Sequence, residues 1–168
     1  MRIFLTGLMG SGKTTFGKEL GRIINFSFVD TDELIEQELK KSITQIFTGE
    51  GESFFRKAEI NLIKDLIHIN ADQVIATGGG MPAIPGLITL LNLNGITVYL
   101  KPSLKTIYKR LTSDKENRPL LKGMTNKEIY SFIRQINRDR GDFYKQAKIT
   151  INPEKVSPDK LAEILFTF

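Results

Sequence analysis

The fold of this chain is decided near its start by the stretch Gly7-Leu8-Met9-Gly10-Ser11-Gly12-Lys13-Thr14. The stretch fits the pattern G-x-x-x-x-G-K-[ST], in which a glycine-rich backbone cradles phosphate groups. The apolar run Ile3-Phe4-Leu5-Thr6 before it is typical of a β-strand. A strand that passes through such a turn into a helix is the context in which this pattern binds phosphate, so we favour phosphate binding over a chance turn before a core helix. The helix is indicated by the spacing of Phe16, Leu20, Ile23 and Ile24.

The residue types of this loop suit the phosphates of a nucleotide. Glycine allows backbone N–H groups to come close to anionic oxygens. The N-terminus of the following helix adds partial positive charge at the same place. We therefore expect Lys13 to reach the β- and γ-phosphates and the Thr14 hydroxyl to ligate Mg²⁺.

Length and composition predict one domain with a sizeable core. The chain has 168 residues, of which 40% are hydrophobic and 26% charged, as in globular proteins. It contains no cysteine, which excludes disulfides and thiolate metal sites. No apolar run is long enough to span a bilayer, and Met1-Arg2-Ile3 leads directly into a strand without a signal peptide. We expect a cytoplasmic protein that contacts no membrane.

The net charge of +5 admits two interpretations. It could mark a nucleic-acid surface, or it could combine surface lysines with arginines that meet small anions. The basic residues are scattered along the chain, and aromatic residues do not alternate with them. We favour the second interpretation and expect no nucleic-acid partner.

Strand-like and helical segments alternate along the rest of the chain. This alternation predicts an α/β fold with a parallel sheet, in which ligands bind beyond the carboxyl ends of the strands. Further strands are predicted at 26–29, 74–77, 96–100 and 149–151. The helical pattern indicates helices around 34–39, after Ser42, from about Ser53, from Pro85 to Leu91, after Ser103, from Ile129 to Arg140, and from Ser157-Pro158 to Phe168.

Two carboxylates follow the second strand. Asp30 and Asp32 share one direction if the backbone stays extended between them, although Asp32 could instead cap the next helix. Many P-loop enzymes hold Mg²⁺ partly through an Asp at the end of a later strand. Here the third strand ends in Thr77-Gly78, so we predict that Asp30 contacts the metal through a water. Asp32 is then placed to orient or deprotonate an acceptor hydroxyl.

The run Gly78-Gly79-Gly80 follows the third strand. Three glycines in one turn carry a high cost in chain entropy. A close approach of the backbone to a ligand explains them better than a simple turn. His68, near a helix end, is interpreted as structural, and no Ser/His/Asp triad or cluster of metal ligands is present in the sequence.

Three more segments are Phe55-Arg56 with Glu59, Arg118-Pro119-Leu120-Leu121, and Arg140 four residues before Tyr144. Together with the segments above, they resemble shikimate kinase. They run in the order of that family and cover nearly the whole chain. The set is specific because the P-loop is combined with Phe-Arg-x-x-Glu, Gly-Gly-Gly and Arg-Pro-Leu-Leu. The other matching segments are the P-loop from Gly7, Asp30-Thr31-Asp32 and Gly78-Gly79-Gly80.

The resemblance implies a P-loop three-layer αβα fold like that of nucleoside monophosphate kinases. It implies a five-stranded parallel sheet in the order 2-3-1-4-5 and one domain over residues 1–168. A substrate-binding region is expected at about 32–60 and a mobile lid at about 112–123, where the sequence is polar and lacks periodicity. The implied activity is transfer of the ATP γ-phosphoryl group to the 3-hydroxyl of shikimate, a step towards chorismate and the aromatic amino acids. A monomer that uses Mg²⁺ is expected.

The resemblance also implies roles for individual residues. Lys13, Asp32 and Arg118 are expected to be catalytic. ATP is expected to contact Gly10, Ser11, Gly12, Lys13, Thr14, Thr15, Arg110 and Arg118. Shikimate is expected to contact Asp32, Arg56, Gly78, Gly79, Gly80 and Arg140, with Phe47 and Phe55 as walls.

The chain departs from the family pattern at Ser113-Asp114-Lys115-Glu116-Asn117 and after Ile151. Two other readings compete with this activity. One is another small-molecule kinase of the same fold, such as a gluconate or nucleotide kinase. The other is a non-catalytic nucleotide-binding module or a basic nucleic-acid-binding protein. The presence of Lys13, Thr14, Asp30 and Asp32 together argues against a module without activity.

Overall fold

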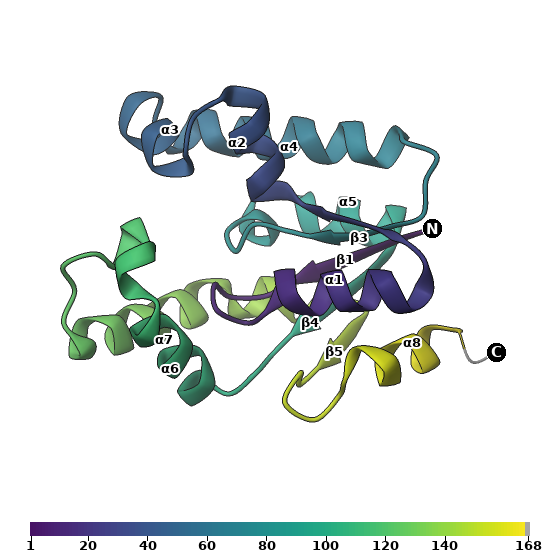
Figure 1. The fold of residues 1–168 in the computed structure, drawn as a ribbon. Coiled ribbons are helices and arrows are strands. Elements are labelled where there is room, and N and C mark those ends of the chain that lie inside the picture. Colours follow the sequence, from purple (N-terminus) through teal and green to yellow (C-terminus); the bar gives the residue numbers. More distant parts are fainter. Residues whose placement is uncertain (167–168) are drawn as a thin grey trace.

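The structure is a computed structural model that describes residues 1–166. A central sheet is covered by helices on both faces (Figure 1). All five strands run parallel in the order β2-β3-β1-β4-β5, which confirms the predicted topology. The strands are β1 Arg2–Thr6, β2 Ser27–Asp30, β3 Gln73–Ala76, β4 Ile96–Leu100 and β5 Ile149–Ile151.

Helices connect the strands, and short 3₁₀-helices occur in two of the connections. The α-helices are α1 Lys13–Ile24, α2 Thr31–Leu39, α3 Ile43–Gly49, α4 Glu52–His68, α5 Leu87–Asn94, α6 Leu104–Ser113, α7 Asn126–Tyr144 and α8 Pro158–Phe166. The 3₁₀-helices are η1 Met81–Ala83, η2 Lys115–Asn117 and η3 Pro119–Leu121.

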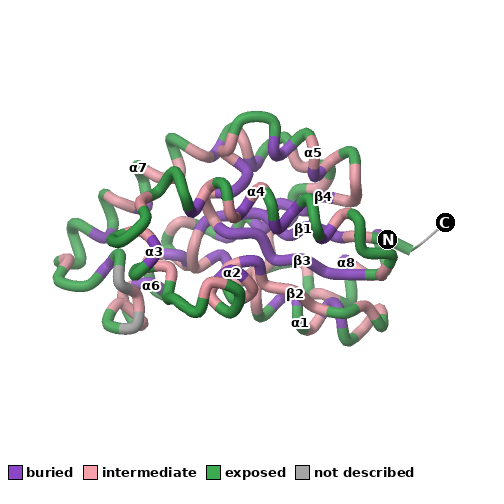
Figure 2. The backbone as a smooth tube through the Cα atoms, turned by 90° about the horizontal axis from the view of Figure 1, so that it is seen from above, coloured by how far each residue is buried: buried purple, intermediate pink, exposed green. Residues whose placement is uncertain are grey.

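The core lies on both faces of the sheet because side chains alternate along each strand. Phe4 of β1 packs in the cluster formed with α2–α5, whereas Ile3 and Leu5 pack in the cluster formed with α1 and α8. The central strands are correspondingly buried along most of their length (Figure 2). A third cluster joins α6 to α7 through residues such as Ile107 and Ile133. The helices that carry the site are thereby fixed against the sheet.

Strand register brings the functional segments to one edge of the sheet. Leu5 pairs with Ala76 of β3 and with Val98 of β4, and Asp30 at the end of β2 pairs with the same Ala76. The strands therefore end side by side. The segments that follow them, which are the P-loop, Asp30–Asp32 and the glycine run, begin at the same edge of the sheet. This confirms that the motifs gather at the carboxyl ends of the strands.

Side chains cap several helices as the sequence predicts. The Ser42 hydroxyl accepts a hydrogen bond from the backbone N–H of Gln45, and the Ser103 hydroxyl accepts one from that of Thr106. Ser157 caps α8 through the N–H of Lys160. These bonds satisfy N–H groups that lack a partner within the first helical turn.

Some boundaries differ from the prediction. Helix α5 begins at Leu87, because Gly86 before it adopts a left-handed conformation with φ +77°. Helix α7 continues past Arg140 to Tyr144, whose side chain is fully buried. Strand β2 lies at the sheet edge and is half-buried, not buried as expected. Phe168 of the predicted C-terminal helix lies outside the described residues.

The predicted lid segment contains more regular structure than its sequence pattern suggests. Helix α6 extends to Ser113, and η2 and η3 follow before Gly123. No helix within residues 1–166 is both long and apolar enough to cross a membrane.

Candidate active site

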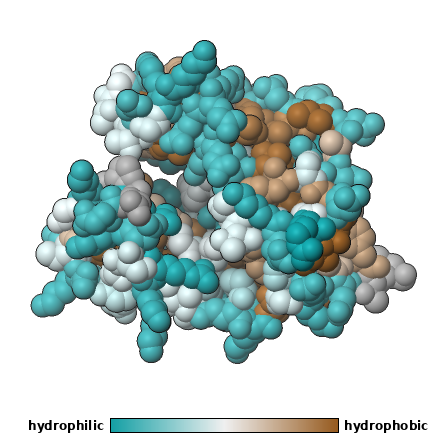
Figure 3. Space-filling model, in the orientation of Figure 1, coloured by the Kyte–Doolittle hydropathy of each residue, from teal (hydrophilic) through white to brown (hydrophobic). Residues whose placement is uncertain are grey.

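A cleft of about 720 Å³ opens beyond the carboxyl ends of the strands. The space-filling view shows a hollow between the α2–α3 lobe and the segment after α6 (Figure 3). Mainly hydrophilic side chains border this hollow. Every residue predicted to contact ATP lines the cleft. The lining includes residues 9–16 of the P-loop and its helix, Glu19, Asp30, Asp32, Thr77, Gly79, Arg110, Ser113, Asp114, Arg118, Pro153 and Pro158.

The conformation of the P-loop depends on a glycine and on Lys13. Gly12, the residue before α1, has φ +97°, a conformation that favours glycine. The Lys13 ammonium group donates hydrogen bonds to the carbonyl oxygens of Gly7, at 2.8 Å, and Leu8, at 3.0 Å. Burial lowers the pKa of Lys13 to about 8, although the nearby Asp32 and Asp30 carboxylates act in the opposite direction. The loop thus holds a cation at the start of a helix.

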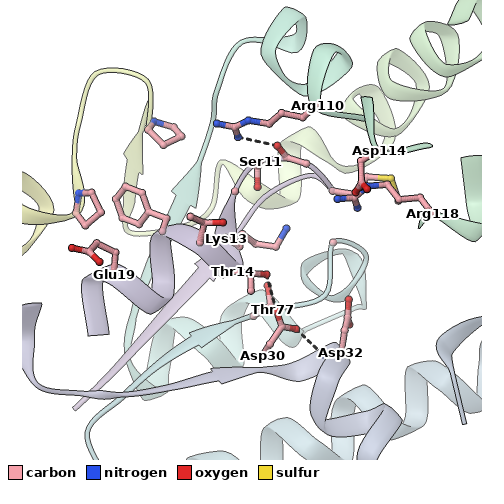
Figure 4. Close-up of a pocket in the computed structure, with 18 of the residues that line it drawn as sticks. Ser11, Lys13, Thr14, Glu19, Asp30, Asp32, Thr77, Arg110, Asp114 and Arg118 are labelled. Carbon is pink, nitrogen blue, oxygen red and sulfur yellow. Dashed lines mark hydrogen bonds and ion pairs between the residues drawn. The ribbon is translucent and has the colours of Figure 1, made fainter. Parts of the chain in front are cut away.

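The carboxylates after β2 have different surroundings. The Thr14 hydroxyl donates to Asp30 Oδ2 over 2.8 Å, and Asp30 Oδ1 accepts from the Asp32 N–H over 3.1 Å (Figure 4). Asp30 is therefore the cap of α2, and the alternative in which Asp32 caps this helix is wrong. The reason is that the backbone turns helical at Thr31, which puts Asp30 in the extended conformation of a cap.

Asp32 is consequently free to face the cleft. Its Oδ1 is buried and has no hydrogen-bond partner among residues 1–166. Burial raises the pKa of Asp32 to about 6, and the Asp30 carboxylate adds to the increase, whereas Lys13 and Arg56 oppose it. An ionisable carboxylate near both the P-loop and an arginine can bind and deprotonate a hydroxyl at neutral pH.

The glycine run leaves space for charged side chains. None of the three glycines has a positive φ. A Cβ on Gly78 would lie 2.7 Å from both Asp32 Oδ1 and Glu59 Oε1, and a Cβ on Gly80 would lie 2.6 Å from Arg56 Nη2. Gly79 lies against the P-loop, where its Cβ would be 3.4 Å from the N atom of Met9, and it lines the cleft. Gly78 and Gly80 therefore make room for packed side chains, which the sequence does not indicate, in addition to any backbone contact with a ligand.

Arg56 is partly buried and pairs with one buried and one exposed carboxylate in an ionic cluster. Its Nη1 lies 2.6 Å from Glu59 Oε2 and its Nη2 lies 2.9 Å from Glu52 Oε1. The guanidinium carbon lies 5.5 Å from the ring centroid of Phe55 and 6.0 Å from that of Phe47. The rings themselves are 4.9 Å apart. The structure therefore brings Arg56, Phe47 and Phe55 together as one wall near Asp32.

Glu59 is a member of this cluster that the predicted site did not include. Its side chain is fully buried, and Oε1 lacks a hydrogen-bond partner among the described residues. Burial raises the pKa of Glu59 to about 7, with Arg56 and Arg140 opposing the increase. A sequence signal was available, because Glu59 falls on the apolar side of α4 between Phe55 and Leu62. A carboxylate in such a stripe indicates a buried partner.

Helix α7 brings Arg140 to the same place. Arg140 acts electrostatically on both Glu59 and Tyr144, so it faces the cluster around Arg56. The Tyr144 hydroxyl donates a hydrogen bond to the Gly79 carbonyl. Tyr144 was also absent from the predicted site. Its position one helical turn after Arg140 places both residues on one face.

Two arginines approach the P-loop from the side of the cleft opposite Asp30 and Asp32 (Figure 4). Arg110 Nη1 donates to the Gly10 carbonyl over 3.0 Å. Arg118 Nε lies 3.0 Å from Asp114 Oδ2, and the Arg118 charge contributes to the lowered pKa of Lys13. The predicted site lacked Asp114, Pro153 and Pro158, which belong to the two segments that depart from the family pattern.

Comparisons with known proteins agree with this geometry. The family model described as shikimate kinase matches residues 9–167. A shikimate kinase from Azobacteroides pseudotrichonymphae is 42% identical over 98% of this chain and 96% of its own length. The crystal structure of shikimate kinase from Bacteroides thetaiotaomicron superposes with a TM-score of 0.93 at 36% identity, covering 98% of each chain. A shikimate kinase from Acinetobacter baumannii, solved in complex with shikimate, gives a TM-score of 0.88 at 31% identity, covering 99% of this chain and 93% of that one.

Proposed function

This chain belongs to the shikimate kinase family, and we propose from the site that it transfers the γ-phosphoryl group of ATP to the 3-hydroxyl of shikimate. The product, shikimate 3-phosphate, leads to chorismate and the aromatic amino acids. The observation that carries the proposal is the position of Asp32. This carboxylate interacts electrostatically with Lys13 of the P-loop and with Arg56 of the neighbouring cluster. It therefore stands between a site for phosphates and a site for an organic anion.

Phosphoryl transfer depends mainly on positioning and on the stabilisation of charge. In our proposal the backbone of the P-loop and Lys13 hold the phosphates, and Arg110 borders the base. Asp32 accepts a hydrogen bond from the 3-hydroxyl and takes its proton as the oxygen attacks. Its pKa of about 6 keeps the carboxylate ionised at neutral pH while leaving it basic enough to act.

The residues present fit a Mg²⁺ ion beside the phosphates. Mg²⁺ prefers oxygen ligands and commonly keeps several waters, with one or two protein groups and the substrate phosphates completing its coordination. The Thr14 hydroxyl and Asp30 Oδ2 lie 2.8 Å apart and would hold the ion, Thr14 as a ligand and Asp30 through a water. No group of three or more His, Cys, Asp or Glu side chains that could hold a metal occurs within residues 1–166. When bound, the ion would neutralise charge on the phosphates.

Arg56 and Arg140 are proposed to grip the carboxylate of shikimate, with Phe47 and Phe55 beside the ring. Gly79 would offer its backbone to the substrate, with Gly78 and Gly80 as its neighbours. A planar guanidinium binds a carboxylate through two parallel hydrogen bonds, whereas an ammonium group cannot. The existing contacts of Arg56 with Glu52 and Glu59 orient its guanidinium before the substrate arrives.

We therefore expect Arg56→Lys and Arg140→Lys each to raise the KM for shikimate far more than the KM for ATP, because charge is kept while the planar fork is lost. Steady-state kinetics with each substrate varied in turn would measure this. Arg138→Lys is the matched control, since Arg138 is an exposed arginine on the same helix as Arg140. Unchanged KM values in both variants would contradict the assignment.

The segment at about 112–123 is proposed to be a mobile lid that closes over the phosphates and brings Arg118 to the transferring group. Such closure keeps water from the γ-phosphate. The ion pair between Arg118 and Asp114 lies within this segment and ties Arg118 to the end of α6. Ser113, Asp114 and Arg118 of the segment line the same cleft as the P-loop, which supports closure onto it.

Arg118→Ala should depress kcat strongly and change either KM much less, because its contact would strengthen in the transition state. Hydrogen exchange across 112–123 should slow when MgADP and shikimate bind together. Lys122→Ala, which removes an exposed cation from the same segment, should leave kcat near the wild-type value. Rapid exchange in the ternary complex, with wild-type kcat for Arg118→Ala, would show the segment to be a simple connector.

A coupled assay of ADP release tests the function directly. Shikimate should support turnover with MgATP, and gluconate and nucleoside monophosphates should not. Turnover with gluconate or a nucleoside monophosphate, but not with shikimate, would identify a different kinase of this fold. Salt-sensitive binding to random DNA without kinase activity would favour the basic binding protein instead.

The residues assigned to ATP line one cleft, and we propose one domain over 1–168 that works as a monomer. Residues 32–60 contribute Asp32, Phe47, Phe55 and Arg56, and form the proposed substrate-binding region. We propose a cytoplasmic enzyme whose partners are small molecules, without nucleic acid or membrane.

A further inference from the structure

Tyr144 ends α7 with a hydroxyl group in the interior of the protein. The residue is fully buried, and its ring packs against Tyr99 with centroids 5.1 Å apart. A buried tyrosine hydroxyl requires a hydrogen-bond partner, and here the partner is the carbonyl oxygen of Gly79. Because Tyr144 is fully buried, it does not contact a ligand in the cleft. Its effect on the site must pass through its neighbours.

The hydrogen bonds of the glycine run show what Tyr144 controls. The Gly78 N–H donates to the buried Thr31 hydroxyl over 2.9 Å, and the Gly78 carbonyl accepts from the Met81 N–H over 3.1 Å. These bonds fix the peptide planes on either side of Gly78. The next plane joins Gly79 to Gly80, and Tyr144 supplies the hydrogen bond to its carbonyl.

Because a peptide is planar, the hydrogen bond to the Gly79 carbonyl also determines the direction of the N–H group in the same plane. In a trans peptide the C=O and N–H point in opposite directions within one rigid plane. A hydrogen bond that fixes the Gly79 carbonyl therefore also fixes the Gly80 N–H, which points away from Tyr144. Glycine gives little resistance to rotation of this plane by itself, so an external restraint is needed.

The same hydroxyl lies beside Arg140, one helical turn earlier on α7. Burial raises the pKa of Tyr144 to about 12, and the adjacent Arg140 opposes the increase. The hydroxyl therefore stays protonated at neutral pH and acts as a donor to Gly79. Its oxygen remains available to the Arg140 guanidinium, which is itself a donor group. One side chain thus holds the glycine run through a hydrogen bond and lies close enough to an arginine of the proposed carboxylate grip to interact with it electrostatically.

We propose that Tyr144 is a positioning residue for the acceptor substrate, whose hydroxyl fixes the Gly79–Gly80 peptide and the Arg140 guanidinium in a single arrangement. The inference rests on the proposed function of the Arg56 and Arg140 cluster. The end of α7 would then affect the affinity for shikimate without affecting the binding of ATP.

The test is Tyr144→Phe, which removes the hydroxyl and keeps the ring that packs on Tyr99. Loss of one such hydrogen bond should raise both the KM and the calorimetric Kd for shikimate by roughly three- to tenfold. The KM for ATP should stay unchanged, and kcat should fall by a smaller factor. Tyr99→Phe is the matched control, because it removes the hydroxyl of the other ring in the same pair, and it should leave both KM values unchanged.

Combination with Arg140→Lys sharpens the test. If Tyr144 acts through Arg140, the two substitutions together should raise the shikimate KM by less than the product of their separate effects. Wild-type KM and Kd for shikimate in Tyr144→Phe would overturn the proposal. Equal increases in both KM values, matched by Tyr99→Phe with the same loss of Tm, would also overturn it by showing a packing effect. Failure of the proposed function is distinguishable, since the wild-type protein would then release no ADP with shikimate.

Discussion

Lys13→Met should abolish turnover with shikimate and MgATP while the fold survives. The substitution removes the cation that would meet the β- and γ-phosphates, and charge stabilisation is the main contribution of the protein to phosphoryl transfer. We expect kcat/KM for ATP to fall by roughly 10³-fold or more, the size found for charged groups that act on a transferring phosphoryl group. The hydrogen bonds from Lys13 to Gly7 and Leu8 are also lost, but they are local to the loop.

Lys18→Met is the matched control for this prediction. Lys18 is an exposed lysine on the same helix, with its ammonium group 5.7 Å from the Phe28 ring centroid. It should retain wild-type turnover. Circular dichroism and Tm would show that Lys13→Met is folded. Near-normal turnover of a folded Lys13→Met protein would refute the assignment of the P-loop.

Asp32→Asn is expected to lose most of its rate and to bind shikimate more weakly. Asparagine keeps the size of the side chain but cannot take the proton of the acceptor hydroxyl. General-base catalysis contributes roughly 10²–10⁴-fold to a rate, so kcat should fall within that range. Because Asp30 caps α2, the loss cannot be attributed to the helix cap. Glu33→Gln, which removes an exposed carboxylate from the next position of the same helix, should have little effect.

The pH dependence of kcat/KM for shikimate provides a second measurement on Asp32. The carboxylate acts only when ionised, so in the wild type kcat/KM should fall as the pH drops through about 6. The decline should be absent from Asp32→Asn. A decline in that variant centred near pH 7 would instead report Glu59, whose pKa is raised to about 7 by burial. Wild-type activity and an unchanged profile in Asp32→Asn would exclude a role as base.

The contrast between Asp30 and Asp32 illustrates a limit of sequence reasoning. Both residues lie next to the turn from strand to helix, and either could cap α2. The outcome depends on the residue at which the backbone changes from extended to helical, and this is Thr31. Boundaries of this kind shift by a residue or two with tertiary packing.

The ionic cluster behind the glycine run shows a second limit. Arg56, Glu59, Arg140 and Tyr144 come from α4 and α7, which are separated by two strands in the chain. Their hydrogen bonds depend on distances of a few ångströms set by how both helices pack on the sheet. Sequence spacing could suggest that Arg140 and Tyr144 share a helix face, but it could not indicate that this face meets Gly79.

The sequence by itself determined the architecture and the chemistry of the nucleotide side. The P-loop pattern, the alternation of strands and helices, and the Asp30-Thr31-Asp32 segment depend on local spacing, which is read directly from the chain. The alternation predicts a parallel sheet, and the strand order 2-3-1-4-5 came from the resemblance to shikimate kinase. Only the tertiary structure decided which side chains fill the space beside Gly78 and Gly80, that Glu59 pairs with Arg56 there, and that Tyr144 holds Gly79. These features depend on contacts between segments far apart in sequence, and close packing rather than local preference selects them.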